Sequence, residues 1–595
     1  MTILQALNRY YERMAVQESI EPFGYSRENI SACIWLNKDG RIVKIDDLNE
    51  YKQKKPEPRR MAVPSAINRT SGVASNFLWD KTAYVLGVGL GKDKKATHFF
   101  EKEHEAFKQL HRMRLAGTQD NGLRALLAFL DQWKAADFES LSGFTKDMLD
   151  KNIIFGVVDE EMSYLHERSA AKVLITAPAE VWKTGMCLIT GQEGPIERLH
   201  PVIKGVEGGQ TSGARIVSYN ADAFTSYGAE DGANAPTSVQ AAFKYGTALN
   251  RLLDRGSGKR MRLADSSVVF WADATPYGEE AAKAAETCMD LIANPPDNLQ
   301  ENQNLRNVMK KIREGQPLSS IYPDLHSQTR FYILGLSPNA ARISVRYWLA
   351  NEFGHFAKNL ANHFENIEIT PAPWGEKLPS LWLLLLKTTA LMEKTGNIPN
   401  QLAGEVARAV FSGQPYPRTL LQAAIMRLRA GDSPRGGWHA AIIKACINRI
   451  AKKEEELPVS RQIDYPDVAY QLGRLFATLE SAQYAALGKV NASITDRFYG
   501  AASSTPARAF PALLRNGRHH ISDARKRKQV GWIEIRLDEI FKKLPPNFPK
   551  ILNLEEQGRF AVGYYHERAW RSPAQKDALQ DQSDTQDVNE NGDEE

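Results

Sequence analysis

Residues 185–253 read GMCLITGQEGPIERLHPVIKGVEGGQTSGARIVSYNADAFTSYGAEDGANAPTSVQAAFKYGTALNRLL. Two short apolar runs, at residues 186–190 and 214–220, predict strands, and a helix is expected from about Ser238. The loops between them are rich in Gly, Ser, Thr, Asn and Gln, so a ligand can approach their backbone N–H groups closely. Such loops suit contacts with a phosphate backbone or a base edge, and they are equally typical of ordinary turns.

The chain has 595 residues, 43% of them hydrophobic, which is enough for three or four domains with normal cores. Its longest apolar run, residues 381–386, is too short to span a bilayer, and the first residues lack the apolar core of a signal peptide. No membrane partner is expected. The cysteines are far apart and lack zinc-site spacing, which predicts buried thiols in a reducing cytoplasm: Cys33, Cys187, Cys288 and Cys446.

The net charge of +5 combines a basic body with an acidic tail. Residues 576–595 contain eight acids and one lysine, so they carry −7 and leave +12 for the rest of the chain. A basic body fits a polyanionic partner. The composition of the tail predicts disorder.

Periodicity predicts an α+β chain, with a β-rich mixed N-terminal part that contains inserted helices and an all-α C-terminal helical bundle. The expected strands are residues 30–35, 41–45, 82–88, 152–158, 173–175, 268–271, 331–334 and 342–348. Beyond about residue 370 the pattern is helical: residues 378–392, 401–411, 418–429, 439–452, 468–487, 532–544 and 552–570. The expected domains are residues 1–365, a helical domain 366–489, a helical module 490–575 and the tail 576–595.

Three further stretches offer groups for nucleic-acid contacts. Prolines disfavour regular structure in residues 52–64, so its cations are expected on an extended segment, either solvated or bound to phosphate: Lys54, Lys55, Arg59 and Arg60. Residues 69–80 gather Arg69, Thr70, Ser71 and Asn76 around a glycine. Arg and Asn pair with guanine and adenine edges, and Ser and Thr reach bases or phosphates, although all are also common turn and cap residues.

The third stretch, residues 497–528, contains many more basic than acidic residues. Its residues 525–528 fall in a helix-like segment, so we expect their charges to be spread around the surface rather than aligned in one stripe. Arg525 and Arg527 are candidates for phosphate contacts, and the alternative is a solvated helix face.

The sequence lacks the usual motifs of catalysis. GVEGGQTSGA has the glycines of a phosphate-binding loop but no Gly-Lys-Ser/Thr, which argues against ATP hydrolysis. His104-Glu105 has no second histidine four residues after the first, so it is not a zinc-protease helix. A binding protein without catalytic residues, metal or cofactor is predicted. The alternatives are a stand-alone metal-dependent nuclease acting on DNA or RNA, and a purely structural scaffold.

Sequence segments spread over the chain resemble segments of the large subunit of the type I-C CRISPR interference complex, Cascade. In order they are LQALNRYYERM, RTSGVASNFLWDKTAYVLG, YLHER, CLITGQEGPIERLHPVIKGVEGGQTSGARIVSYNADAFTSYG, GANAP, LSPNAARISVRYW and GRFAVGYYHER. They span nearly the whole chain, which indicates an end-to-end family member rather than a shared domain.

The resemblance implies an RNA-guided surveillance function in the cytoplasm. The subunit would recognise the protospacer-adjacent motif in double-stranded DNA, help form the R-loop and recruit the helicase-nuclease. Its partners would be the guide RNA (crRNA), the target DNA and displaced strand, and the guide-end capping, backbone filament and small subunits. In this family a separate small subunit can be translated from within the C-terminal part, and residues 491–500 resemble its beginning.

Residue chemistry then suggests candidates for these tasks. Motif reading needs neutral donors, phosphate contacts need cations, and strand separation needs an apolar wedge. Phe77 and Trp79 are the wedge candidates. The motif-binding candidates are Arg69, Thr70, Ser71, Asn76, Gln210, Thr211, Ser212 and Asn234. The candidates for phosphate contacts near the glycine-rich loops are Lys204, Arg215 and Lys244.

Overall fold

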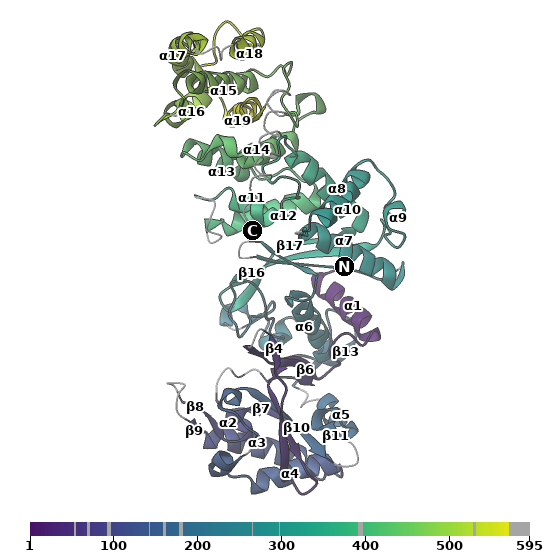
Figure 1. Ribbon diagram of the computed structural model, residues 1–595. Coiled ribbons are helices and arrows are strands. Elements are labelled where there is room, and N and C mark those ends of the chain that lie inside the picture. The colour runs from purple at the N-terminus through teal and green to yellow at the C-terminus, as the bar shows by residue number, and fades with distance from the viewer. Residues whose placement is uncertain are drawn as a thin grey trace. The chain divides into compact units, whose positions relative to one another are not determined.

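A computed structural model of the chain (Figure 1) shows two compact units. The first unit comprises residues 1–203 and 217–251, and the second comprises residues 204–216 and those from 252 onward. The structure describes residues 1–52, 55–67, 69, 72–91, 97–141, 143–158, 162–177, 182–219, 221–263, 266–275, 277–296, 298–390, 397–488, 490–526 and 531–570.

The first unit alternates short strands with helices. Its helices are α1 (Ile3–Val16), α2 (Thr82–Val85), α3 (Glu101–Arg114), α4 (Asn121–Gln132), α5 (Ser169–Thr176) and α6 (Val239–Leu253). Its strands are β1 (Tyr25–Ile30), β2 (Ala32–Leu36), β3 (Ile42–Asp47), β4 (Glu50–Lys52), β5 (Lys55–Glu57), β6 (Arg59–Pro64), β7 (Trp79–Lys81), β8 (Val88–Leu90), β9 (Thr97–Phe99), β10 (Asn152–Val158), β11 (Met162–Tyr164), β12 (Thr184–Met186) and β13 (Glu193–Pro195).

A five-stranded sheet forms the centre of the first unit. Its strand order is β11-β10-β2-β3, and β7 also pairs with β10. The apolar runs of β2 and β10 pair in parallel and are buried on both faces, which is typical of a central parallel pair. Helices α3 and α4 cover one face, where Phe107 and Phe129 pack near Phe155 with ring centroids 6.2 and 5.6 Å away.

The second unit joins a sheet to a helical bundle. Strands β14 (Arg260–Leu263), β15 (Ser266–Ala272), β16 (Arg330–Asn339) and β17 (Arg342–Glu352) form an antiparallel sheet in that order. Its helices are α7 (Gly278–Ala293), α8 (Leu299–Arg313), α9 (Leu318–Ile321), α10 (Phe353–Ile367), α11 (Leu381–Leu386), α12 (Asn400–Ser412), α13 (Arg418–Arg429), α14 (Trp438–Asn448), α15 (Val468–Leu487), α16 (Ile494–Ser504), α17 (Pro506–Lys526), α18 (Gly531–Phe541) and α19 (Leu554–Ala569).

Helix α15 is the central helix of the C-terminal bundle. It lies among α16–α19 (Figure 1), and most of its residues are buried all around its circumference. Glycines permit a close approach to α19, because a Cβ at Gly473 would lie 2.0 Å from the Phe560 carbonyl oxygen and one at Gly563 2.1 Å from that of Tyr470. One continuous apolar core extends from β15 and β16 through these helices.

The predicted fold class is confirmed: a β-rich N-terminal part with helices precedes a helical C-terminal part. The helices expected at residues 418–429 and 468–487 are confirmed to the residue as α13 and α15. The four cysteines are buried, as expected. The finer division into domains stays a prediction.

Several predicted strands are wrong. Residues 173–175 lie in α5, because Ala171, Leu174 and Ile175 reach the core at helical spacing. The strand expected at residues 82–88 begins as α2. Residues 187–190 form a turn closed by the Gly191 N–H and the Cys187 carbonyl oxygen, 2.8 Å apart. The run 214–219 forms no strand: Ala214 and Arg215 make β-bridges, and the residues after them are irregular.

The prediction that residues 52–64 lack regular structure is wrong. Apart from Pro58, the described residues of this segment belong to β4, β5 and β6, and β6 pairs with β1 along six residues. The prolines are compatible with these strands because Pro64 ends β6 and the β4–β5 pair is an isolated two-stranded edge.

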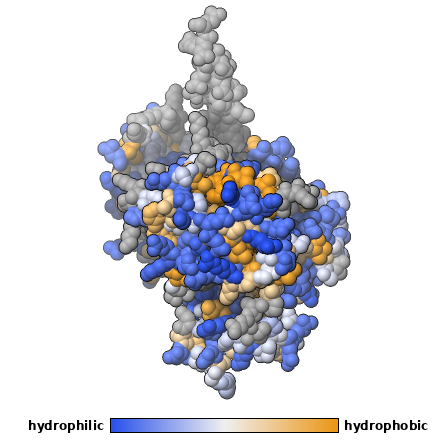
Figure 2. Space-filling view, turned by 90° about the horizontal axis from the view of Figure 1, so that it is seen from below, coloured by the Kyte–Doolittle hydropathy of each residue, from blue (hydrophilic) through white to orange (hydrophobic). Residues whose placement is uncertain are grey.

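The described helices do not have the length and apolarity of membrane spans. None of the helices in the described part of the chain is long and apolar enough to cross a bilayer. On the face seen in Figure 2, hydrophilic residues predominate and hydrophobic residues form separate groups.

Candidate nucleic-acid interface

The loop before β7 is held by a buried carboxylate. Asp80 is 1% exposed; its Oδ2 accepts a hydrogen bond from the Asn76 N–H at 2.8 Å and forms an ion pair with Arg69. The Arg69 guanidinium also lies 4.1 Å from the Tyr84 ring centroid. Burial raises the pKa of Asp80, and the Asn76 N–H and Arg69 partly offset this. Arg69 therefore stabilises the loop from inside.

The other candidates in this loop are also placed inward or lie outside the described residues. Asn76 is 5% exposed, and its Oδ1 accepts a hydrogen bond from the Ile67 N–H at 3.0 Å. The Phe77 ring stacks on His111, with centroids 5.4 Å apart, and Trp79 Nε1 donates to the Pro64 carbonyl oxygen at 2.8 Å. Both rings belong to the core, so a wedge role would require them to leave it. Thr70 and Ser71 lie outside the described residues.

Two of the predicted phosphate contacts lie on an exposed strand. Arg59 and Arg60 are exposed on β6, opposite Ile30 and Asn29 of β1. Lys55 begins β5, and Lys54 lies outside the described residues. The structure thus provides a defined strand, rather than a mobile segment, for Arg59 and Arg60.

The glycine-rich loop around Gln210 is exposed and firmly anchored in the second unit. Gln210, Thr211 and Ser212 are exposed. On one side, the Glu207 N–H donates to Ser267 Oγ at 2.9 Å, and its carboxylate pairs with Arg260 at 3.0 Å and Arg262 at 3.2 Å.

On the other side of this loop, Arg215 connects it to β17. The Arg215 carbonyl oxygen accepts a hydrogen bond from the Ile343 N–H at 3.0 Å. Arg215 is half-buried, and Lys204, which precedes the loop, is exposed. The uncharged side chains of the loop are therefore exposed on a backbone that is anchored on both sides, and Glu207, at one anchor, also holds the half-exposed Arg262.

Asn234 belongs to the first unit, where it closes a different loop. Its Oδ1 accepts from the Ser226 N–H at 2.9 Å, and its Nδ2 donates to the carbonyl oxygens of Ala229 and Asp231, both at 3.1 Å. Three hydrogen bonds within the loop use the groups that a base would need. Lys244, also predicted to bind phosphate, pairs with Glu12 at 2.7 Å.

The Asn234 loop presents two aromatic side chains that the sequence analysis did not single out. Phe224 is 42% exposed, and Tyr227, with a φ of 52°, is fully exposed. An aromatic residue next to glycine in a polar loop is the sequence signal for such a group. These rings, unlike Phe77 and Trp79, are accessible for stacking.

Helix α17 carries a basic stripe, defined here as Arg508, Arg515, Arg518 and Arg525. All four side chains are exposed, and at 3.6 residues per turn they lie within about 100° of one another. The opposite face, with Phe510 and Leu513, is buried. These four charges lie along one side of the helix. The expected spread of the charges of residues 525–528 stays a prediction, because only Arg525 and Lys526 of them are described. Arg527 lies outside the described residues.

A family model described as CRISPR-associated protein (Cas_Csd1) matches residues 7–572. The chain belongs to this family. As a Cas_Csd1 member it is a large subunit of the type I-C Cascade and part of a complex with other Cas subunits, which confirms the resemblance seen in its sequence. A comparison with curated proteins gave no match.

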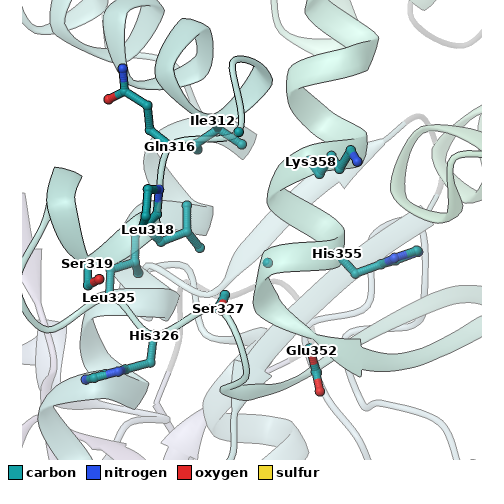
Figure 3. A pocket seen from close by; sticks show the side chains of 13 residues that line it. Ile312, Gln316, Leu318, Ser319, Leu325, His326, Ser327, Glu352, His355 and Lys358 are labelled. Atoms are coloured by element: carbon teal, nitrogen blue, oxygen red, sulfur yellow. The ribbon is translucent and has the colours of Figure 1, made fainter.

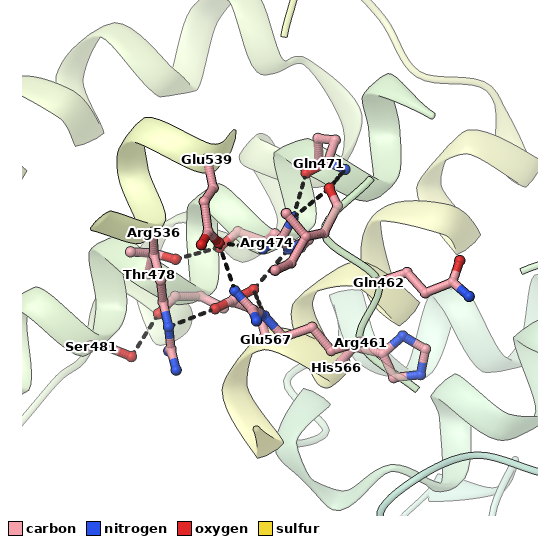
Figure 4. A network of polar contacts seen from close by, with 12 residues as sticks. Arg461, Gln462, Gln471, Arg474, Thr478, Ser481, Arg536, Glu539, His566 and Glu567 are labelled. Atoms are coloured by element: carbon pink, nitrogen blue, oxygen red, sulfur yellow. Dashed lines mark hydrogen bonds and ion pairs between the residues drawn. The ribbon is translucent and has the colours of Figure 1, made fainter. Parts of the chain in front are cut away.

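In this Cas_Csd1 chain a buried charge network joins the parts of the C-terminal bundle (Figure 4). Glu567 of α19 pairs with Arg461 and Arg474, both at 2.7 Å, and with Arg536 of α18 at 3.2 Å. Glu539 pairs with Arg461 at 3.0 Å. Burial lowers the pKa of Arg536 to about 10. The network fixes α15, α18 and α19 together, and a single sequence gives no means of predicting it.

A shallow pocket of about 380 Å³ lies between the α8–α9 connection and the start of α10 (Figure 3). Leu318 and Leu325 line one side, and His355 and Lys358 extend from α10 on the other. Within the described residues His355 forms no hydrogen bond with a hydroxyl or carboxylate, so no nucleophile–base pair is assembled. No group of three or more metal-ligating side chains occurs in the part of the chain that the structure describes.

Proposed function

We propose that this Cascade subunit recognises the protospacer-adjacent motif in double-stranded DNA, promotes unwinding of the target and R-loop formation, and holds the displaced strand. The guide RNA then reads the target by base pairing, and the bound complex recruits the helicase-nuclease. The subunit itself cleaves nothing. A related division of tasks, in which protein reads a short motif and RNA reads the target, operates in single-protein effectors.

The observation that carries the proposal is the exposed, anchored loop Gln210–Thr211–Ser212 in a chain that belongs to this family. Its side chains are uncharged donors and acceptors, which suit base edges in a groove. Its two anchors, Glu207 and Arg215, fix it to β15 and β17, so binding needs little reorganisation. Asn76 and Asn234 are weaker candidates, because their side chains hold their own loops.

Cations on separate surfaces supply the sequence-independent part of binding. Arg59 and Arg60 lie exposed on β6, and the basic stripe of α17 offers a track for a single strand. Tyr227 is the most accessible ring for stacking on an unpaired base. Each contact to phosphate adds to the salt dependence of binding, whereas contacts to bases set the preference for the motif.

The test is DNA binding by the assembled complex, with and without this subunit, at fixed salt. Targets with the correct and an altered flanking motif are compared. Replacing Gln210, Thr211 and Ser212 by Ala is expected to reduce discrimination by about ten- to a hundredfold, as lost base contacts do. The matched control is Q401A, which removes an exposed glutamine of α12.

Each result has a definite meaning. Discrimination that survives the triple replacement would exclude this loop as the reader of the motif. Equal discrimination by the complex without the subunit would exclude the motif-reading function itself. Metal-dependent cleavage by the purified subunit, abolished by a carboxylate replacement, would favour the nuclease alternative.

A further inference from the structure

The basic stripe of α17 lacks acidic partners along most of its length. Among the described residues, Arg508, Arg515 and Arg518 form no ion pair. Arg525 pairs with Glu534 of α18, and Lys526 beside it pairs with Asp523. Three neighbouring guanidinium groups without counter-charge form a polyanion-binding surface of low specificity.

The chain leaves the bundle close to one end of this stripe. Trp570 follows α19, and its ring centroid lies 4.2 Å from the Arg536 guanidinium of α18. Two residues before Arg536 in the same helix, Glu534 accepts a hydrogen bond from Arg525 Nε at 3.0 Å. One short helix therefore contacts both the exit point of the chain and the stripe.

The acidic segment, residues 576–595, begins six residues after Trp570. Its acids recur every three or four residues, at Asp577, Asp581, Asp584, Asp587, Glu590 and Asp593, and Glu594 and Glu595 follow. A six-residue connection spans up to ~20 Å, and the stripe from Arg508 to Arg525 is about 26 Å long. The segment is long enough to cover the stripe completely.

We propose that the acidic segment binds the basic stripe of α17 in the same chain and competes there with nucleic acid. Tethering gives the segment an effective concentration of about 1 mM, so even a weak, salt-sensitive contact is populated. The segment then repels stray polyanions, and a strand delivered at high local concentration by R-loop formation displaces it. This consequence rests on the proposed function, whereas the contact within the chain does not.

The contact is tested with the full chain after its eight acids in the segment are neutralised: D577N, D581N, D584N, D587N, E590Q, D593N, E594Q and E595Q. A fluorescent peptide of residues 571–595 is then titrated by anisotropy at fixed salt. Binding is expected, and it should weaken at least about tenfold when R508Q, R515Q and R518Q are added, since three charge pairs are lost. The matched control, K310Q with K311Q and K358Q, removes three exposed cations elsewhere.

Competition is tested with a non-specific single-stranded DNA 20-mer. The acid-neutralised chain should bind it at least about tenfold more tightly than the natural chain, because a tethered competitor at ~1 mM is removed. Failure of the peptide to bind, or equal weakening by the stripe and control replacements, would overturn the proposal. Peptide binding without any DNA binding by either chain would support the contact between the acidic segment and the basic stripe. The same result would contradict the proposed nucleic-acid role of α17.

Discussion

Nε of Arg474 donates a hydrogen bond to Oε2 of Glu567 at 2.7 Å, and both side chains are almost completely buried. Glu567 also pairs with Arg461 and Arg536, so its carboxylate is the shared anionic partner of three guanidinium groups that water cannot reach fully. Removing one member of a buried ion pair leaves an uncompensated charge, which typically costs about 3–5 kcal/mol. E567A is therefore expected to lower the stability of the bundle by about this amount.

The measurement is hydrogen exchange in α15 and α19, because local exchange reports the stability of the bundle separately from the first unit. E555A, in the first turn of the same helix, is the matched control and should change protection by less than about 1 kcal/mol. Unchanged protection in E567A would show that the network contributes nothing to stability.

The second prediction concerns Arg69 and Asp80. R69A should destabilise the loop before β7 by about 2–3 kcal/mol, somewhat less than a fully buried pair, because Arg69 is partly exposed. The double variant R69A/D80N should recover part of the loss, since it removes the unpaired charge. The experiment is urea unfolding of both variants and of the natural chain.

The pH dependence separates this structural role from a DNA contact. Burial raises the pKa of Asp80 above that of the unfolded chain, so the carboxylate disfavours folding at neutral pH and its protonation favours folding as the pH falls. The difference in stability between R69A and the natural chain should therefore shrink on acidification. A difference that is the same at every pH would contradict a buried, unpaired Asp80.

The helices of the second unit were predictable because their signals are local. Asp467 caps α15 by accepting a hydrogen bond from the Tyr470 N–H at 2.8 Å, and Gly488, with a φ of 70°, ends it. The strands of the first unit were less predictable. Residues 173–175 have the β-branched composition of a strand, but their contacts with the core select a helix.

The sequence predicted which residue types the candidate site contains, but not which groups of the chain their side chains bond to. The sequence indicates that Asn76 and Asn234 can form hydrogen bonds, yet their loops already use these groups. The Gln210–Thr211–Ser212 loop is exposed because its anchors are at Glu207 and Arg215, in contacts with β15 and β17 that are distant in the sequence. A single sequence contains no record of such contacts.

The third prediction concerns Lys444 and the pH dependence of the stability of the folded chain. It is 2% exposed, its Nζ donates to the carbonyl oxygen of Asn366 at 3.1 Å, and burial lowers its pKa to about 8. Between about pH 8 and 10.4 the unfolded chain binds more protons than the folded one, so stability should rise with pH by up to about 3 kcal/mol.

The measurement is urea unfolding at several pH values, compared with K444M. Other groups that titrate in this range are common to both proteins and cancel in the difference. The stability of the natural chain relative to K444M should increase between pH 7 and 10.5. A constant difference would mean that Lys444 titrates normally and is not buried as a cation.

The last prediction concerns a separate C-terminal product of the gene. Residues 490–570 contain α16–α19 but lack α15, the helix around which these four pack. Without α15, Glu567 loses Arg474, and the close contact at Gly473 and Gly563 disappears. A fragment that begins at residue 490 should therefore fail to fold cooperatively, whereas one that begins at residue 458 retains α15 and Arg461.

Circular dichroism during thermal unfolding of the two purified fragments, 458–570 and 490–570, distinguishes them. The longer fragment should give a sigmoidal transition, and the shorter one a gradual change without a transition. A natural small subunit made from this gene should then begin before Val468, and not at residues 491–500, where the sequence resembles the start known in the family. Mass spectrometry of the expressed gene would distinguish the two starts. A cooperative transition of fragment 490–570 would contradict the central role of α15, because its buried faces would have been dispensable.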